Sequence, residues 1–319
     1  MKPAESNSDE TRPQPRHKEP FTEPLGFSWT QRHWRGFWTA VAFLTRIPTP
    51  LSNFDDPSRI REDLRLAPRY FPVVGGFIGT VTFGVVLAAD LCWPLPVAVL
   101  IGLACEALLT GAFHEDAVAD FFDAFGGGWN REDILRILKD SRIGSFGLVG
   151  LGLAMALRAG GMMSLSETLL GPVMIASSTL GRWNILVVMM CVAPVAERDS
   201  ISRDVGQRMG FVDLIWGTVL SVPGSLWVVL LTPVRLFLFV IVCGIFGLTF
   251  SGYLRRRLGG VTGDCLGCVC YLTQVLVLLL GSAHIEGVVS ASCRLSKISP
   301  GEIRSAKAIP AISFDSSNS

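Results

Sequence analysis

The sequence predicts an all-α membrane protein, a polytopic bundle of about seven transmembrane helices preceded by one interfacial helix. Half of the 319 residues are hydrophobic and only 17% are charged, which is too apolar for an ordinary soluble domain. The mean hydropathy of +0.45 agrees with this. The apolar residues gather in stretches of about 20, the length that an α-helix needs to cross a bilayer. The net charge of +1 gives no general attraction to nucleic acid.

Composition divides the chain into three parts. Residues 1–36 are rich in Pro, Glu, Ser and Arg, without an apolar core for a secretory signal, and predict a disordered extension. Residues 37–283 hold the apolar stretches and predict one membrane-embedded domain. Residues 284–319 return to a polar, mixed composition and predict a C-terminal tail.

The apolar stretches differ in length, and this decides which of them can span. The first, residues 34–50, is short and ends in two prolines, so we expect an interfacial or re-entrant helix there. The glycines after Phe71-Pro72 suit close packing of the next helix, and Pro223 and Pro233 are places where later helices kink or break. Seven longer stretches are expected to span the membrane: 70–89, 95–113, 145–163, 169–195, 211–232, 234–253 and 263–283.

The distribution of basic residues favours one orientation in the membrane. If the N-terminus is cytoplasmic, four segments with three or more basic residues each lie on that side: 1–69, 114–143, 196–210 and 254–262. The loops on the other side contain a single basic residue, Arg235; these loops are 90–94, 164–168 and 233–235. This asymmetry follows the positive-inside rule, to which the basic C-terminal tail is the exception.

The charge of this apolar chain concentrates in an acidic stripe formed by Asp116, Asp120 and Asp123. On a helix these carboxylates fall within an arc of roughly 60° and about 10 Å along the axis. No Lys or Arg three or four residues away relieves their repulsion, so a cation would stabilise them, and oxygen-only ligands favour Mg²⁺ or Mn²⁺ over zinc. A solvated helix face is the alternative. The preceding apolar run favours a functional site, because unpaired carboxylates are costly at a membrane.

Two further segments are predicted to face the cytosol with the stripe, so that one site could use all three. Lys139 and Arg142 are predicted phosphate contacts, because cations beside a metal-bound carboxylate stabilise charge in phosphoryl transfer. Their alternative role is to fix the topology. In the segment 255–264, Thr262 and Asp264 lie at a helix entrance, where Asp264 either contacts substrate or caps the helix.

Several ionisable residues lie in apolar surroundings and should face the bundle interior or an interface. Arg46 and Arg182 are two of these, and Arg46 is the better candidate for a substrate contact. Glu106 either extends the acidic site or pairs with one of these arginines. His114 is either a catalytic or merely an interfacial residue.

Five motifs carry a resemblance in their order and spacing: FLTRIPTP (43–50), FPVVGGFIG (71–79), LLTGAFHEDAVADFFDAFGGG (108–128), KDSRIGSFG (139–147) and GGVTGDCLG (259–267). From residue 37 to residue 283 the chain resembles the cobalamin synthase family, adenosylcobinamide-GDP ribazoletransferase. The family pattern is similar to H-x-D-G-x-A-D-x-x-D, which falls on His114 and the three aspartates of the stripe. Ala117 stands where glycine is usual.

The resemblance implies a Mg²⁺-dependent enzyme of the bacterial inner membrane, with its active site facing the cytoplasm. It implies transfer of the adenosylcobinamide phosphate of adenosylcobinamide-GDP to α-ribazole or its 5′-phosphate, with release of GMP, late in cobalamin synthesis. The implied partners are these substrates and the lipid bilayer. An association with other enzymes of the pathway is a further expectation. The implied site residues are Asp123 and His114 for catalysis, Asp116, Asp120 and Asp123 for the metal, and Arg46, Lys139, Arg142, Thr262 and Asp264 for substrate.

Two other interpretations stay open on the sequence alone. A CDP-alcohol phosphotransferase also uses spaced aspartates on membrane helices, in a pattern similar to D-G-x-x-A-R followed by G-x-x-x-D-x-x-x-D. Here Asp120 stands in place of the arginine, and the final spacing is three. A transporter would bind a solute with intramembrane Arg46, Glu106 and Arg182, but the charges gather on one face and no inverted repeat is visible.

Overall fold

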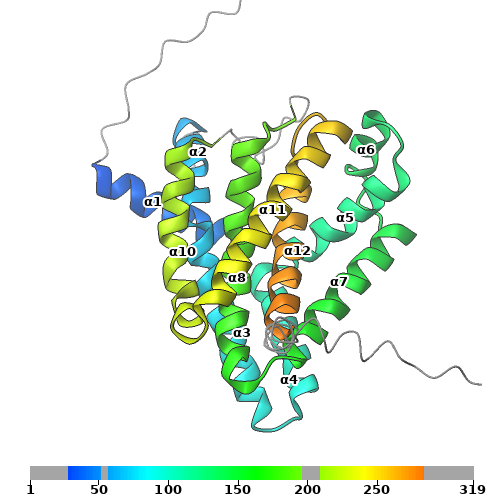
Figure 1. Cartoon of the computed structure of the whole chain (residues 1–319). Helices are drawn as coiled ribbons and strands as arrows, with labels where there is room; N and C mark the ends of the chain where they lie inside the picture. Colours follow the sequence, from blue (N-terminus) through cyan, green and yellow to red (C-terminus); the bar gives the residue numbers. More distant parts are fainter. Residues whose placement is uncertain (1–27, 52–56, 196–208, 284–319) are drawn as a thin grey trace, which may run out of the picture.

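The computed structural model describes residues 28–51, 57–195 and 209–283, and within them the regular secondary structure consists of helices and one isolated bridge (Figure 1). Residues 1–27 of the predicted extension, residues 52–56 and 196–208, and the tail after residue 283 lie outside the described residues. Residues 29–36, predicted as part of the disordered extension, are helical instead. The elements are α1 (Trp29–Leu44), α2 (Pro57–Leu66), the 3₁₀ helix η1 (Ala67–Tyr70), α3 (Phe71–Asp90), α4 (Leu95–Thr110), α5 (Phe113–Gly127), α6 (Arg131–Ile137), α7 (Ser145–Met163), α8 (Glu167–Cys191), α10 (Phe211–Leu231), α11 (Pro233–Arg257) and α12 (Gly263–Ser282).

The predicted membrane bundle is confirmed, with one span of a different shape. Among the described residues, six helices are long and apolar enough to cross a membrane: the one that runs through α3 to Asp90, and α7, α8, α10, α11 and α12. The predicted span 95–113 is not one straight helix. Its helix, α4, ends at Thr110, and α5 continues from Phe113 at an angle of 90°, so that the two helices together form either a broken span or a re-entrant loop.

Burial separates the centre of the bundle from its lipid-facing side. In α8 the apolar window is 83% buried, whereas in α10 and α11 it is 22% and 28% buried. We infer that α8 is the central helix and that the large exposed apolar side chains of α10 and α11 face lipid. Pro223 lies inside α10 without ending it, and Pro233 begins α11, where a proline needs no hydrogen-bonding N–H.

The close helix packing predicted from the glycines after Phe71-Pro72 is confirmed. A Cβ added to Gly75 of α3 would lie 2.5 Å from the backbone oxygen of Ser178 in α8, so only glycine fits at this crossing.

The first helix has the length of an interfacial helix and not of a span. Its 16 residues give about 24 Å, which is shorter than a hydrocarbon core of about 30 Å. Ser28 and Gln31 form a capping box at its start, and Arg35 pairs with Asp63 of α2 at 2.7 Å. Its buried face packs on the bundle while Trp29 remains exposed.

The two ends of the bundle carry the loops that the charge pattern assigns to opposite sides of the membrane. Figure 1 shows α2, α6 and the turn between α11 and α12 at the upper end, and the α3–α4 and α7–α8 connections at the lower end. The sidedness itself stays a prediction.

Ala117 and Gly267 form a close crossing of α5 with α12, and this gives a test of the packing. A Cβ added to Gly267 would lie 2.4 Å from the Cβ of Ala117. We therefore expect Gly267→Ala to destabilise the protein by about 1–3 kcal/mol, seen as a lower melting temperature in lipid nanodiscs. Adding Ala117→Gly should recover part of the loss. Gly244→Ala is the matched control, because nothing lies within 4 Å of an added Cβ there; equal melting temperatures for Gly267→Ala and this control would contradict the close crossing.

Candidate active site

The acidic stripe lies on α5, directly after the bend. The bend consists of Gly111 and Ala112, which both have left-handed backbone angles, with φ of 72° and 56°. One face of α5 is buried in the bundle: Ala117, Val118, Ala119, Phe121 and Ala124. Of the stripe, Asp116 is exposed and Asp120 and Asp123 are half-buried. The predicted helical spacing of the three aspartates is therefore present on one helix.

Asp123 joins the stripe to the predicted basic turn, residues 139–144, which contains Lys139 and Arg142. Its carboxylate accepts hydrogen bonds from the backbone N–H groups of Gly144, at 2.6 Å, and Gly147, at 2.8 Å. These N–H groups belong to the first turn of α7, where a carboxylate also interacts favourably with the helix dipole. Asp123 thus fixes the start of α7 beside the end of α5.

A cleft of about 430 Å³ opens where these segments meet. Its lining includes Asp123 of the stripe and four residues of the basic turn, together with Gly127 and Phe146; the four are Asp140, Arg142, Ile143 and Gly144. Lys139 is exposed but does not line this cleft. The structure therefore brings Asp123 and Arg142 to one cavity and leaves Lys139 at its outside.

Asp140 and Arg142 form an ion pair at the edge of the cleft. The guanidinium group contacts both carboxylate oxygens, with the shortest distance 2.7 Å. Hydrogen bonds from the side chain and the backbone of Arg142 lower the pKa of Asp140 to about 2. A lowered folded-state pKa stabilises the fold above the ordinary pKa of about 4, and this contribution is lost as the pH falls through the folded-state value. The pair is therefore intact at neutral pH.

The glycine-rich loop, which we define as residues 255–264, lies next to the turn that follows the stripe. Arg257 donates to the backbone oxygen of Gly128 at 2.8 Å, and Arg131 donates to the backbone oxygen of Leu258 at 3.0 Å. These contacts place the loop beside the turn that joins α5 to α6. The use of all three segments by one site stays a prediction. At the helix entrance, the N-cap residue of α12 is Thr262, whose hydroxyl accepts from Cys265 N–H. Asp264 lies in the first turn, so the capping role considered for it belongs to Thr262.

Arg46 and His114 lie near the bend, not in the cleft. The backbone N–H of Arg46 donates to Leu109 at 2.8 Å, and its exposed side chain packs on the backbone of Gly111. His114 is 2% exposed, and its Nε2 has no hydrogen-bond partner among the described residues. A residue two positions before Asp116 points to the opposite side of the helix, so His114 is separated from the stripe. Its catalytic role stays a prediction.

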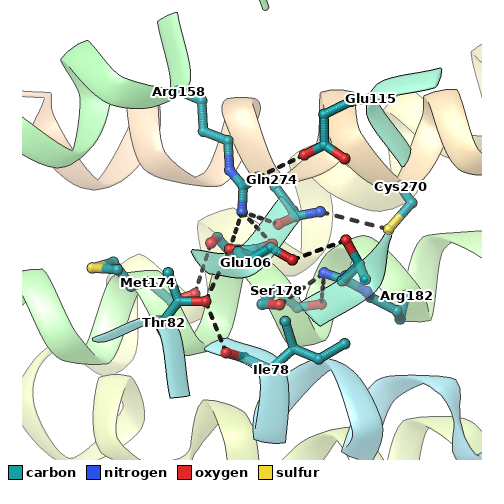
Figure 2. A network of polar contacts seen from close by, with 12 residues as sticks. Ile78, Thr82, Glu106, Glu115, Arg158, Met174, Ser178, Arg182, Cys270 and Gln274 are labelled. Carbon is teal, nitrogen blue, oxygen red and sulfur yellow. Dashed lines mark hydrogen bonds and ion pairs between the residues drawn. The ribbon is translucent and has the colours of Figure 1, made fainter. Parts of the chain in front are cut away.

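A buried polar network lies where α4, α7 and α12 meet (Figure 2). Arg158 of α7 donates to both carboxylate oxygens of Glu106, at 2.7 and 2.8 Å, and to Gln274 at 2.7 Å. The partner of Glu106 is therefore Arg158, and not Arg46 or Arg182 as considered from the sequence. Arg182 is fully buried, as predicted, and hydrogen-bonds to Ser178 of its own helix.

Sequence reasoning did not single out Arg158. The signal was available, because an arginine within the apolar stretch 145–163 is as costly for lipid to solvate as Arg182 is in its own helix.

The donor set of the stripe fits an open Mg²⁺ site. In the described part of the chain, no group of three or more His, Cys, Asp or Glu side chains is arranged to hold a metal ion. Mg²⁺ does not need such a group, since it keeps several waters and is often held by one or two carboxylates together with substrate phosphates. Asp116 and Asp120, one turn apart, supply this kind of carboxylate pair, whereas Asp123 already accepts two backbone N–H groups.

Fold and site together define a polytopic membrane protein in which the end of an acidic helix and a basic turn border one cleft. A family model described as cobalamin-5-phosphate synthase matches residues 36–282. The chain belongs to this family, and it is an enzyme of cobalamin synthesis, as the resemblance implied.

Curated relatives agree with this family. Proteins named adenosylcobinamide-GDP ribazoletransferase from Ralstonia pickettii and Shewanella frigidimarina are 35% and 34% identical to this chain, covering 78% and 76% of it and 95% and 92% of their own lengths. One from Leptospira biflexa is 33% identical over 77% of this chain and 94% of its own length. No solved structure matches.

Proposed function

We propose that this chain transfers the adenosylcobinamide phosphate group of adenosylcobinamide-GDP to α-ribazole, or to its 5′-phosphate, and releases GMP. The observation that supports this proposal is the contact of Asp123 with the N–H groups of Gly144 and Gly147, because Asp123 of the stripe and Arg142 line the same cleft. Phosphoryl transfer needs little covalent work from the protein and depends on positioning and on charge stabilisation. In this cleft the guanidinium of Arg142 supplies positive charge beside the carboxylates of Asp123 and Asp140.

In the proposed reaction, the 3′-hydroxyl oxygen of the ribose bonds to the phosphorus nearer the cobinamide. The bond from that phosphorus to the bridging oxygen breaks, so that GMP leaves with that oxygen. The hydroxyl proton passes to a base, for which we propose Asp123. Its carboxylate lines the cleft, and each oxygen has acceptor capacity beyond the one N–H bond that it accepts.

The metal proposed for the site is Mg²⁺, held by Asp116 and Asp120, with Asp123 as the third ligand if it does not act as the base. When bound, Mg²⁺ supplies positive charge that polarises phosphoryl oxygens and stabilises a leaving phosphate. The position of Asp116 on an exposed part of α5 leaves room for a substrate diphosphate beside it.

Arg142 is the proposed phosphate contact that the structure supports best. Its guanidinium is already oriented by a carboxylate, Asp140, and a phosphate offers the same two-oxygen geometry. Substrate can therefore replace Asp140 as its partner. Lys139, Thr262, Asp264 and Arg46 are proposed as further substrate contacts, in which Lys139 acts from outside the cleft.

We place the enzyme in the bacterial inner membrane with this cleft towards the cytoplasm. On that side it could associate with other enzymes of the pathway. The support is the excess of basic residues at the end of the bundle that holds α6 and the α11–α12 turn.

The proposed function is tested by an assay of the purified protein in lipid with adenosylcobinamide-GDP, α-ribazole and Mg²⁺. The expected result is a cobalamin product and GMP in equal amounts, with both lost in EDTA and recovered when Mg²⁺ is added back. Absence of transfer under these conditions would overturn the proposed reaction, and transfer that persists in EDTA would remove the metal from it.

Arg142→Ala is expected to raise the KM for adenosylcobinamide-GDP by about tenfold, equal to roughly 1.4 kcal/mol, with a smaller change in kcat. The reason is that the substrate loses a charged hydrogen-bond donor at the edge of the cleft. Arg136→Ala is the matched control, because Arg136 is exposed as well but pairs with Asp133 of its own helix. Steady-state kinetics of the two variants decide the matter, and equal KM values would speak against a phosphate contact at Arg142.

A further inference from the structure

The bend between α4 and α5 requires a left-handed backbone conformation that alanine, at position 112, does not favour. Ala112 is the one non-glycine residue with positive φ among the described residues. Left-handed backbone costs free energy for any residue with a Cβ. Such a conformation persists where the surrounding structure holds it. The bend matters because Asp116, which we propose as a metal ligand, lies in the first turn after it.

Two carboxylates flank the bend, and one arginine reaches both. Glu106 lies in the last turns of α4, and Glu115 lies in the first turn of α5. Arg158 of α7 hydrogen-bonds to Glu106, and its Nη1 lies 3.8 Å from Oε1 of Glu115 (Figure 2). The same guanidinium therefore contacts a residue on each arm of the bend.

The three charged side chains are largely shielded from solvent. The Arg158 side chain is 2% exposed, and those of Glu106 and Glu115 are 4% and 14% exposed. Gln274 of α12 accepts from Arg158, and the ring of Tyr271 lies 5.0 Å from its guanidinium carbon. A buried ion pair is weak evidence for stability, because desolvation offsets much of the attraction; it can instead select one conformation. Here the conformation that such a pair would select is the bent arrangement of α4 and α5.

We propose that Arg158 is a positioning residue for the transfer reaction: by binding Glu106 and Glu115 at once, it fixes the angle of α5 and thereby the place of Asp116 and Asp120. This inference rests on the proposed function, since it gives the stripe its role. Arg158 itself touches neither the proposed metal nor the substrate; it acts through the backbone that joins Glu115 to Asp116.

The test uses Arg158→Met in the full-length protein in lipid nanodiscs. We expect amide hydrogen exchange at residues 111–120 to become at least about tenfold faster, because α5 loses its attachment to α7. We also expect the Mg²⁺ concentration for half-maximal turnover to rise about 10- to 100-fold, as for other residues that orient metal ligands. A purely structural role would lower the amount of folded enzyme without changing this concentration.

Two variants serve as controls. Arg182→Met removes another fully buried arginine, which hydrogen-bonds to Ser178 of its own helix, and it should leave exchange at 111–120 within about twofold of the original. Combining Glu106→Gln with Arg158→Met removes the buried charge that Arg158→Met alone leaves on Glu106, and it should recover part of the thermal stability without recovering turnover. Recovery of full turnover in this double variant would show that Arg158 only neutralises Glu106, and would overturn the inference.

The remaining outcomes separate this inference from the proposed function. Unchanged exchange at residues 111–120 in Arg158→Met, or faster exchange with unchanged Mg²⁺ dependence, overturns the positioning role. Asp116→Asn in the same experiments should lose turnover while α5 keeps its protection. If Asp116→Asn keeps full turnover, the proposed role of the stripe fails, whatever Arg158→Met does to the bend.

Discussion

Replacing Asp116 or Asp120 with asparagine is expected to lower the rate of GMP release by about 10²–10³-fold or more, the effect of losing one group that stabilises transition-state charge. Asparagine keeps the shape of the side chain but removes the negative charge that would hold Mg²⁺ at the stripe. Asp116 is exposed on α5, so this change leaves the packed face of the helix untouched. The variants should therefore remain folded and membrane-inserted.

The measurement is the initial rate of GMP release in lipid at saturating substrate, with the amount of inserted protein determined for each variant. Glu132→Gln is the control, because Glu132 is an exposed acidic residue on a different helix, α6, outside the stripe. It should keep the original rate. Full activity in both aspartate variants would refute the assignment of the metal to the stripe.

Asp123→Ala should have a second kind of effect, in which stability falls together with activity. The Asp123 carboxylate accepts from the N–H groups of Gly144 and Gly147, and its loss leaves the start of α7 without this cap. We expect the free energy of unfolding to fall by about 2–4 kcal/mol, from the loss of two hydrogen bonds to a charged group. Turnover should fall further than folding alone explains, because the proposed base is gone.

The matched control is Asp116→Ala on the same helix, which removes an exposed carboxylate and should change the stability by less than about 0.5 kcal/mol. Thermal melting in nanodiscs, with hydrogen exchange of residues 144–150, compares the two. If both variants melt together with the original protein, the capping role of Asp123 is wrong.

The stripe could be predicted because it is a local property of the sequence. Asp116, Asp120 and Asp123 are separated by four and three residues, and any helix through them aligns their side chains. The positions between them include Ala117 and Phe121, which are buried, so the pattern also fixed which face is packed. The membrane bundle followed in the same way from stretch length and composition.

The bend could not be predicted from the same pattern. Hydropathy averages composition over a window and carries no information on backbone direction, so residues 95–113 resembled one continuous span. The one local signal was Gly111, which can adopt positive φ at little cost. Ala112 gives no such signal, because alanine favours a helix.

Contacts between distant segments were equally hidden. Arg158 lies 52 residues from Glu106, and nothing in either stretch specifies the other. Asp123 caps a helix that begins after it in the chain, whereas capping patterns read from sequence concern neighbours within a few residues. At α12, both Thr262 and Asp264 are good capping residues, and only the extended backbone of Thr262 decides between them.

The position of the metal decides whether the stripe is the catalytic centre. That position can be measured directly in crystals grown with Mn²⁺ and adenosylcobinamide-GDP, in which the anomalous scattering of Mn²⁺ locates the metal. We predict Mn²⁺ bound by carboxylate oxygens of Asp116 and Asp120, with the substrate diphosphate between the metal and Arg142. A metal bound away from α5, or a diphosphate bound outside the cleft of Asp123 and Arg142, would contradict the proposed site.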